Sequence, residues 1–378
     1  MSSFEANRRE FLKVAGASVA AATLTSTLAA QDPAAQAAAA SPRNKPFGYA
    51  VVGIGGLSKS DILPAFAHTR HARLTGLVSG NVDKARDFAT KYGVPESGLY
   101  TYDTFDKIAD NPEIDAVYIV LPNNMHAEYT LRAFKAGKHV LVEKPMAVSV
   151  KECEAMIAAG KEANRLLSVA YRLRYEPYTQ EMIRMARENV LGKPRVIVTE
   201  AGFNIGNPEQ WRLAKGPAGG GSMMDIGIYA LNAARYLSGE EPTEVMAMES
   251  TDPNDPRFQE VENTVTFQLR FPSGVLASCV SSYATSLNRF RVHAERGSFE
   301  LEPGLSRRGL AMQVFSKGKT EPREFPQVDQ FAAMMDDLAV CAAEGKTPIT
   351  DGTDGLNDLR VIEAVYQSMR TGQSVKLS

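Results

Sequence analysis

The chain has 378 residues, of which 44% are hydrophobic and 23% charged, as in ordinary globular proteins. At roughly 150 residues per domain this length predicts about two domains with full cores, which excludes a disordered or fibrous protein. Lys and Arg number 42 against 44 Asp and Glu, so the net charge is −2 and nucleic acid is not an expected partner. No stretch resembles a helix that would stay in a bilayer, so we do not expect a membrane protein.

The first 30 residues have the layout of an export signal. Residues 7–13 read Asn-Arg-Arg-Glu-Phe-Leu-Lys, and a mildly apolar run over 14–28 ends in small residues. Paired arginines before Phe-Leu-Lys are typical of a twin-arginine signal, although Asn7 replaces the usual Ser or Thr. A buried amphipathic helix with two chance arginines is the alternative. The pattern predicts a periplasmic protein exported in the folded state, which hints at a cofactor bound before export.

Residues 31–45, rich in Ala, Pro and Gln, predict an arm or linker. Sparse cysteines and scattered histidines follow, so we expect neither a disulfide framework nor a metal site. The cysteines are Cys153, Cys279 and Cys341.

Residues 46–170 alternate between strand and helix patterns, which predicts a parallel, doubly wound dinucleotide-binding (Rossmann) domain. The expected strands are 47–52, 74–78, 114–121, 139–142 and 166–170, and the expected helices are 62–66, 83–92, 126–136 and 151–164.

Residues 171–378 show closely spaced strands joined by short turns. They predict an α+β domain that binds substrate and mediates oligomerisation, with a mainly antiparallel open sheet and helices on one face. The expected strands are 244–248, 264–271, 275–283, 290–294 and 312–315, and the expected helices are 176–188, 224–236, 331–343 and 355–370. Residues 304–324 show no interpretable pattern.

A glycine pair follows the first predicted strand. Gly53 permits a tight turn, and Gly55 lets a pyrophosphate approach the backbone at the start of a helix. The third glycine position of the fingerprint is Ser58, so a plain turn is the alternative.

The second strand predicts which nicotinamide cofactor binds. NAD-binding folds usually place a carboxylate at its end, but here residues 78–81 read Val-Ser-Gly-Asn, with Lys84 and Arg86 just beyond. A hydroxyl and a cation suit a 2′-phosphate, so the pattern favours NADP. A solvated helix face carrying Lys84 and Arg86 is the alternative.

Three side chains form a candidate proton-transfer set. Lys144 follows the strand 139–142, at the sheet edge where ligands bind. Asp225 and Tyr229 are four residues apart and would share one helix face. A phenol is a poor base at neutral pH, and a nearby ammonium favours its ionised form. A structural role for the helix pair is the alternative.

Several motifs together resemble the glucose–fructose oxidoreductase branch of the Gfo/Idh/MocA oxidoreductase family, which includes aldose–aldose oxidoreductases. The resemblance runs from about residue 46 to the C-terminus, with the export signal in addition. The motifs are Ile-Leu-Pro-Ala-Phe at 62–66, Val-Ser-Gly-Asn at 78–81, Ala-Val-Tyr-Ile at 116–119, Leu-Pro-Asn at 121–123, Glu-Lys-Pro at 143–145, Gln-Trp-Arg at 210–212 and the run 219–229.

The resemblance implies roles for individual residues. Lys144 would contact substrate and activate Tyr229 as the acid/base, and Asp225 would orient sugar hydroxyls. Arg172, Trp211 and Arg212 would flank the nicotinamide. A core aromatic is the alternative role for Trp211. The implied cofactor-binding residues are Gly53, Gly55, Leu57, Ser79, Gly80, Lys84, Tyr102, Leu121, Pro122, Asn123, His126, Glu143, Lys144, Arg172, Trp211 and Arg212.

The implied activity uses a tightly bound NADP(H) that cycles between two sugars. An aldose such as glucose would be oxidised to its aldonolactone, and fructose or another aldose reduced to an alditol, in ping-pong fashion. Relatives form dimers or tetramers, and an N-terminal arm can cover a neighbour's cofactor. An ordinary NADP-dependent sugar dehydrogenase and a non-catalytic sugar- or nucleotide-binding protein are the alternatives.

Overall fold

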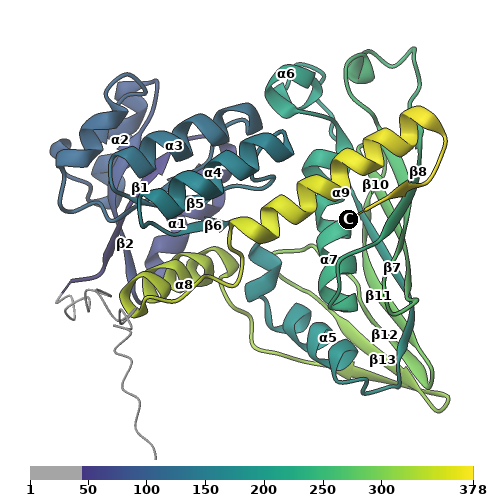
Figure 1. Cartoon of the computed structure of the whole chain (residues 1–378). Coiled ribbons are helices and arrows are strands. Elements are labelled where there is room, and N and C mark those ends of the chain that lie inside the picture. The colour runs from purple at the N-terminus through teal and green to yellow at the C-terminus, as the bar shows by residue number, and fades with distance from the viewer. Residues whose placement is uncertain (1–44, 378) are drawn as a thin grey trace, which may run out of the picture. The chain divides into compact units, whose positions relative to one another are not determined.

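The computed structural model describes residues 45–377 (Figure 1), so the predicted signal and nearly all of the predicted arm lie outside the described residues. The described chain begins with a six-stranded parallel sheet in the order β3-β2-β1-β4-β5-β6, the Rossmann arrangement. Its strands are β1 (Phe47–Val52), β2 (Ala72–Val78), β3 (Leu99–Tyr100), β4 (Ala116–Ile119), β5 (His139–Val142) and β6 (Leu167–Val169). The predicted Rossmann domain is confirmed.

The strands of this sheet are apolar on both faces because helices cover both. Tyr49 and Val51 of β1 pack into one hydrophobic cluster, and Ala50 and Val52 pack into the other. The covering helices of this half are α1 (Leu63–Ala65), α2 (Val82–Tyr92), α3 (His126–Lys135) and α4 (Val150–Glu162).

The helix predicted over 62–66 lies within a helical segment that is irregular and consists of three short pieces. A π-helical turn, η1 (Ser58–Ile62), leads into α1 and then the 3₁₀ turn η2 (Phe66–His68). Pro64 lacks a backbone N–H, so a regular helix cannot run through it unbroken. The remaining 3₁₀ turns are η3 (Glu96–Gly98), η4 (Phe105–Asp110), η5 (Asn123–Met125), η6 (Arg172–Tyr175), η7 (Trp211–Leu213) and η9 (Pro256–Phe258).

The second half contains a nine-stranded sheet in the order β14-β13-β12-β11-β7-β10-β9-β8-β15. All neighbours are antiparallel except β7 and β10, which run parallel, so the predicted mainly antiparallel sheet is confirmed. The strands are β7 (Pro194–Gly202), β8 (Glu244–Ser250), β9 (Thr264–Arg270), β10 (Leu276–Ser282), β11 (Leu287–Ala294), β12 (Gly297–Leu301), β13 (Met312–Ser316), β14 (Lys319–Arg323) and β15 (Val375–Lys376).

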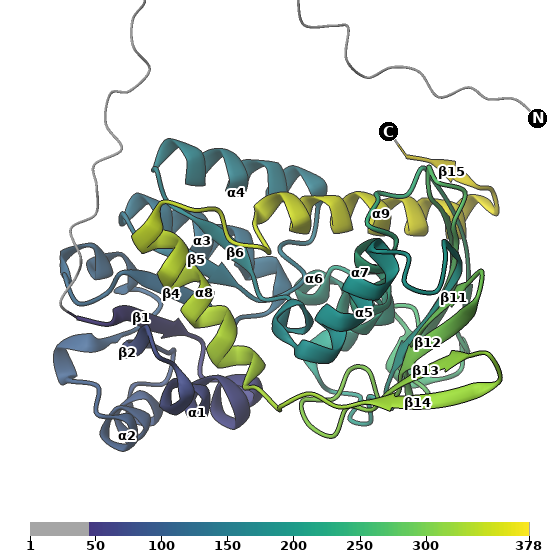
Figure 2. The same cartoon turned by 90° about the horizontal axis from the view of Figure 1, so that it is seen from below.

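Helices cover one face of the larger sheet (Figure 2). These are α5 (Pro177–Arg187), α7 (Ile228–Ser238) and α9 (Gly352–Thr371). The short helix α6 (Lys215–Ala218) and the π-helical turn η8 (Met223–Gly227) precede α7. The uncovered face exposes the side chains of Val196, Met246, Met248 and Leu276.

The chain returns to the dinucleotide domain near its end. Helix α8 (Gln330–Glu344) packs Met335 and Leu338 into the cluster that contains Tyr49, whose hydroxyl donates to the Met335 carbonyl at 2.9 Å. Asp336 accepts hydrogen bonds from three consecutive backbone N–H groups of residues 70–72. Helix α8, which belongs to the predicted segment 171–378, therefore packs against strands of the predicted segment 46–170.

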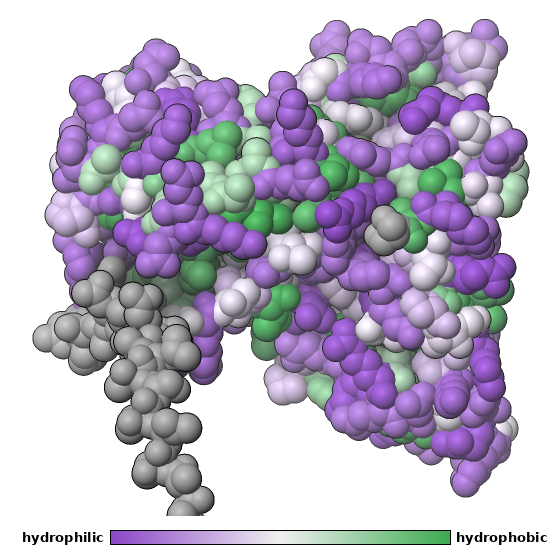
Figure 3. All heavy atoms as spheres, viewed as in Figure 1, coloured by the Kyte–Doolittle hydropathy of each residue, from purple (hydrophilic) through white to green (hydrophobic). Residues whose placement is uncertain are grey.

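The surface shown in Figure 3 is mostly hydrophilic, with small hydrophobic patches. Within residues 45–377, no helix combines the length and hydrophobicity needed to cross a membrane. The three cysteines are buried and form no disulfide.

Candidate active site

The glycine loop begins directly after β1. Gly53 has a φ of +96°, and a Cβ there would lie 2.4 Å from the Val120 carbonyl oxygen, so only glycine fits. Gly55 and Gly56 are exposed, and a Cβ on either would meet nothing within 4 Å. Ser58, at the third glycine position, is buried, and its hydroxyl donates to the Gly53 carbonyl at 2.5 Å. The serine at the third glycine position therefore ties the start of the following helical turn back to the glycine loop.

A cleft of about 670 Å³ opens beside this loop. It lies at the carboxyl ends of β1 and β4, where the strand order reverses and α/β proteins bind ligands. Predicted site residues that line it are Gly53, Gly55, Leu57, Lys84, Tyr102, Leu121, Pro122, Asn123, Glu143, Lys144, Arg172, Trp211, Arg212, Asp225 and Tyr229. Lining residues absent from the predicted site are Ile54, Gly56, Ser60, Val120, Ala170, Phe203, Gln210, Ile226, Arg307 and Phe331.

Three predicted residues lie outside the lining. Ser79 is buried, and its hydroxyl accepts a hydrogen bond from the Asn81 N–H at 3.1 Å. Gly80 is exposed next to the ring of Tyr102. His126 is fully buried, and its two ring nitrogens lie 2.8 and 2.9 Å from the Pro145 and Leu121 carbonyl oxygens. Burial lowers the pKa of His126 to about 4, so the imidazole is neutral, donates its single N–H to one of these carbonyls and supports the cleft wall from behind.

Asp225 is the centre of a charged network at the floor of the cleft. Its Oδ1 accepts from Lys144 Nζ at 3.0 Å, and Lys144 also donates to the Asp225 carbonyl at 2.5 Å. Its Oδ2 accepts from Arg212 Nε at 3.1 Å and from the Tyr283 hydroxyl at 3.0 Å. Both carboxylate oxygens thus have protein donors, and sequence reasoning had missed Tyr283.

The network fixes the charge of its members. Burial alone would raise the pKa of Asp225, but the positive charges of Lys144 and Arg212 outweigh it and lower that pKa to about 2. Burial alone would lower the pKa of Lys144, but the carboxylate of Asp225 outweighs it and raises that pKa. At neutral pH the pair is therefore a carboxylate and an ammonium.

Asp225 and Tyr229 do not share the regular α-helix that their spacing predicts. Residues Met223–Gly227 form a π-helical turn, and α7 begins at Ile228. Gly227 packs closely against Ser281, since a Cβ there would lie 2.8 Å from that side chain. Both side chains still line the same cleft, and π-turns are frequent at functional sites.

Two cations flank the ring of Tyr229. Lys144 Nζ lies 4.8 Å from the ring centroid, and the Arg172 guanidinium carbon lies 5.1 Å from it. Arg172 is held by the Gln330 side-chain oxygen and the Leu305 carbonyl, each at 2.5 Å. Within residues 45–377 the Tyr229 hydroxyl makes no hydrogen bond, so it is available to a ligand in the cleft.

Glu143 and Trp211 complete the walls. Glu143 is buried and accepts from the Tyr118 hydroxyl at 2.7 Å, and burial raises the pKa of its carboxyl. Trp211 is half-buried with Arg212 over its ring at 4.6 Å. Because Trp211 lines the cleft, it is not a core aromatic.

The residues present fit a dinucleotide. The open backbone of Gly55 and Gly56 leaves room for a pyrophosphate, and Lys84 lines the cleft beyond it. Arg86 points elsewhere and pairs with Glu96 at 3.2 Å, so Lys84 alone of the two predicted cations reaches the cleft.

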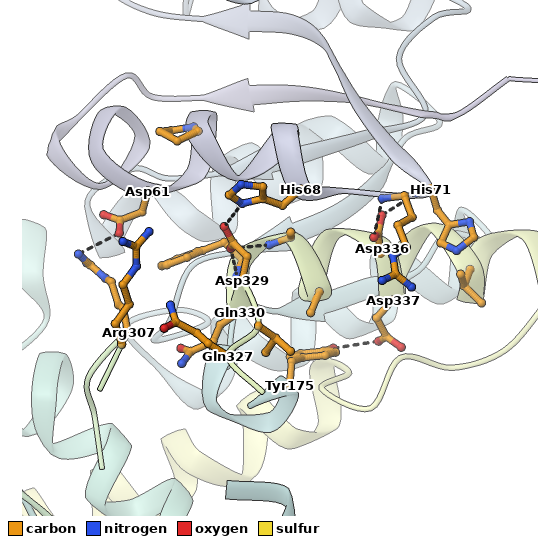
Figure 4. Close-up of a pocket in the computed structure, with 18 of the residues that line it drawn as sticks. Asp61, His68, His71, Tyr175, Arg307, Gln327, Asp329, Gln330, Asp336 and Asp337 are labelled. Carbon is orange, nitrogen blue, oxygen red and sulfur yellow. Dashed lines mark hydrogen bonds and ion pairs between the residues drawn. The ribbon is translucent and has the colours of Figure 1, made fainter. Parts of the chain in front are cut away.

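A second, larger groove of about 1,220 Å³ runs between α8 and the turns η1 and η2 (Figure 4). Its polar side chains are mostly paired: His68 with Asp329 at 2.8 Å, and Arg307 with Asp61 at 2.9 Å. The predicted catalytic and cofactor-binding residues all lie outside it.

The fold and the cleft together define a dinucleotide-dependent oxidoreductase. Two family models match: "Oxidoreductase family, NAD-binding Rossmann fold" over residues 47–171 and "Oxidoreductase family, C-terminal alpha/beta domain" over residues 183–377. The chain belongs to the Gfo/Idh/MocA oxidoreductase family, as the motifs predicted.

Similar proteins include sugar enzymes. An aldose-aldose oxidoreductase from Caulobacter crescentus, solved with glycerol, is 51% identical, with a TM-score of 0.87 over 88% of this chain and 100% of that one. The D-xylose 1-dehydrogenase [NADP(+)] of Haloarcula marismortui is 31% identical over 88% of this chain and 94% of its own. A 3-ketoreductase from Actinomadura kijaniata, solved with NADP, shares the fold at 23% identity and a TM-score of 0.76.

Proposed function

We propose that the protein is an NADP(H)-dependent sugar oxidoreductase that retains its cofactor and transfers hydride from one sugar to another. The observation that carries this proposal is the placement of Tyr229 in the dinucleotide cleft, with Lys144 and Arg172 both close to its ring. The 51% identity with an aldose-aldose oxidoreductase supports sugars as substrates.

In the oxidative half-reaction, Tyr229 takes the proton from the anomeric hydroxyl of an aldose such as glucose. Lys144 and Arg172 place two positive charges close to the ring of Tyr229, and Asp225 holds the Lys144 ammonium in place. A nicotinamide cofactor held at the glycine loop and Lys84 would supply the hydride carrier, so that the aldose would lose a hydride and a proton and leave as an aldonolactone. Tyr229 would return the proton to the acceptor, fructose or a second aldose, which would gain the same hydride and leave as an alditol.

Cofactor retention is tested with purified, extensively desalted protein and no added nicotinamide. Glucose should raise the reduced-nicotinamide absorbance, and a chase of fructose or a second aldose should bleach it. Absence of any rise until free NADP is supplied would contradict a resident cofactor. That result would favour the ordinary dehydrogenase, which the likeness to a D-xylose 1-dehydrogenase keeps as the second candidate.

The role of Tyr229 is tested with Tyr229→Phe. The variant should keep its bound NADP(H), while both half-reactions slow by about 10²- to 10⁴-fold, the usual contribution of one acid/base group. Near-normal turnover would refute the assignment.

Export and assembly complete the proposal. Residues 1–30 direct folded export to the periplasm by the twin-arginine route, and the mature chain forms a homodimer or homotetramer. Light scattering of the purified protein measures the oligomer, and a monomer at all concentrations would contradict this part.

A further inference from the structure

A separate cavity of about 440 Å³ lies where the turn η6 meets α5, α7 and the start of α9. It shares no lining residue with the catalytic cleft. Three arginines line it, Arg174, Arg187 and Arg235, together with four acidic residues. The balance of charge therefore depends on which of these groups are already paired.

The acidic groups are all engaged. Glu241 and Asp354 both bind Arg235, with closest contacts of 2.6 and 3.0 Å. Asp351 caps the N-terminus of α9 by accepting from two backbone N–H groups. Glu240 accepts from the Ser273 hydroxyl at 2.6 Å. The buried guanidinium of Arg235 is therefore fully paired, since it also forms a salt bridge with Asp358 at 2.6 Å.

Arg174 and Arg187 have no such partners. Neither forms a salt bridge with any residue of the described chain, and the buried Nε of half-buried Arg174 has no hydrogen-bond acceptor. The Arg174 guanidinium stacks on the ring of Tyr236 at 4.3 Å. Arg187 is exposed at the mouth of the cavity and packs over Gly239.

The two guanidinium groups also repel each other. Burial, and then the nearby charge of Arg174, lower the pKa of Arg187, and no carboxylate contributes an opposing shift. Two guanidinium groups brought together with no direct salt bridge repel each other, and an anion bound between them would reduce that repulsion.

We propose that this cavity binds a phosphate group between Arg174 and Arg187. Guanidinium groups match phosphate oxygens in paired hydrogen bonds, which lysines cannot do. The volume accommodates an inorganic phosphate or a small phosphate monoester, and both sources share the same chemistry.

The position of the cavity links it to the catalytic cleft. The four-residue turn η6 carries both Arg172, which contacts the ring of Tyr229, and Arg174, which contacts the ring of Tyr236. Both rings belong to α7. A phosphate bound by Arg174 would therefore contact the same short turn that carries Arg172.

The test is calorimetric titration of the holoenzyme with inorganic phosphate and with glucose 6-phosphate, at ionic strength matched with NaCl. Arg187→Ala removes one of the two cations, and Arg184→Ala is the matched control on the same helix, because Arg184 is already paired with Glu181 and Glu188. We expect saturable binding whose Kd rises at least about tenfold in Arg187→Ala and is unchanged in Arg184→Ala, since a bond between charged groups has that size.

Binding of both probes would show that the phosphate group alone is recognised, and binding of the ester alone would show that its organic part is also required. Either result supports the site. Absence of saturable binding, or the same affinity in Arg187→Ala, would overturn it, because a phosphate bound in the cofactor cleft would not respond to Arg187. The measurement needs no turnover, so it is independent of the proposed sugar activity.

Discussion

Replacing Asp225 with Asn removes one negative charge from the floor of the cleft and keeps the side-chain shape. In the native protein this carboxylate receives Lys144, Arg212 and Tyr283, and its side chain is 16% exposed. The amide of Asn cannot neutralise the two cations. We therefore expect a stability loss that depends on pH.

The magnitude follows from the pKa of Asp225, which is about 2 in the folded protein against an ordinary value of 3.8. This difference contributes about 2 kcal/mol to the free energy of unfolding at neutral pH. Because the folded pKa is the lower one, the contribution is complete above about pH 5 and is lost as the pH falls, with about 1 kcal/mol gone by pH 3. The raised pKa of Lys144 has the opposite sign, so its contribution is lost only above its ordinary value of 10.5.

Urea unfolding of both proteins at pH 7 and pH 3 measures this effect. The difference in unfolding free energy between wild type and Asp225→Asn should be about 1 kcal/mol larger at pH 7 than at pH 3. Asp83→Asn is the control, because the Asp83 side chain is 94% exposed and its difference should hardly change with pH. An equal difference at both pH values for Asp225→Asn would refute the reasoning.

Three further predictions concern the glycine loop, the cofactor and export. Gly53→Ala should lower the melting temperature by several degrees, because its Cβ would lie 2.4 Å from the Val120 carbonyl oxygen. Gly55→Ala should leave the melting temperature of the cofactor-free protein unchanged but weaken NADP(H) binding. Calorimetry measures the first effect, and titration with the cofactor measures the second. Lys84→Ala should weaken the binding of NADP(H) at least about tenfold and leave the affinity for NAD(H) nearly unchanged, as measured by fluorescence titration. Equal losses of affinity for both cofactors would contradict the contact of Lys84 with the 2′-phosphate. Arg8→Lys with Arg9→Lys should leave the protein in the cytoplasm, as fractionation of cells would show, and normal export would contradict the twin-arginine assignment.

The sequence predicted the Rossmann half well because its strands are covered on both faces and read as continuous apolar runs. In the second half it missed β7, β12, β14 and the two-residue strand β15. Strand β7 mixes buried with exposed positions, so its apolar run is short, although it lies near the centre of the sheet. Strand β14 is exposed along its whole length and contains Pro322, as an edge strand allows, so it has no apolar pattern.

The candidate site was predicted in the same uneven way. The sequence identified Lys144, Asp225 and Tyr229 because each lies in a short motif of reactive residue types, and all three line the cleft. Tyr283, which donates a hydrogen bond to Asp225, could not be identified from the sequence because the two residues are 58 positions apart. His126 lies in a predicted motif, yet its packing behind the wall depends on two carbonyls that only the fold brings together.

By itself, then, the sequence determined the central strands of the parallel sheet, the glycine turn and the identity of the reactive side chains, because local patterning and turn chemistry depend on neighbours along the chain. The tertiary structure decided which charges meet. The ion pair of Lys144 with Asp225 and the contact of Arg172 with the ring of Tyr229 join segments that are distant in sequence. Electrostatic energies depend on separation and burial, and these are fixed only when the chain has folded.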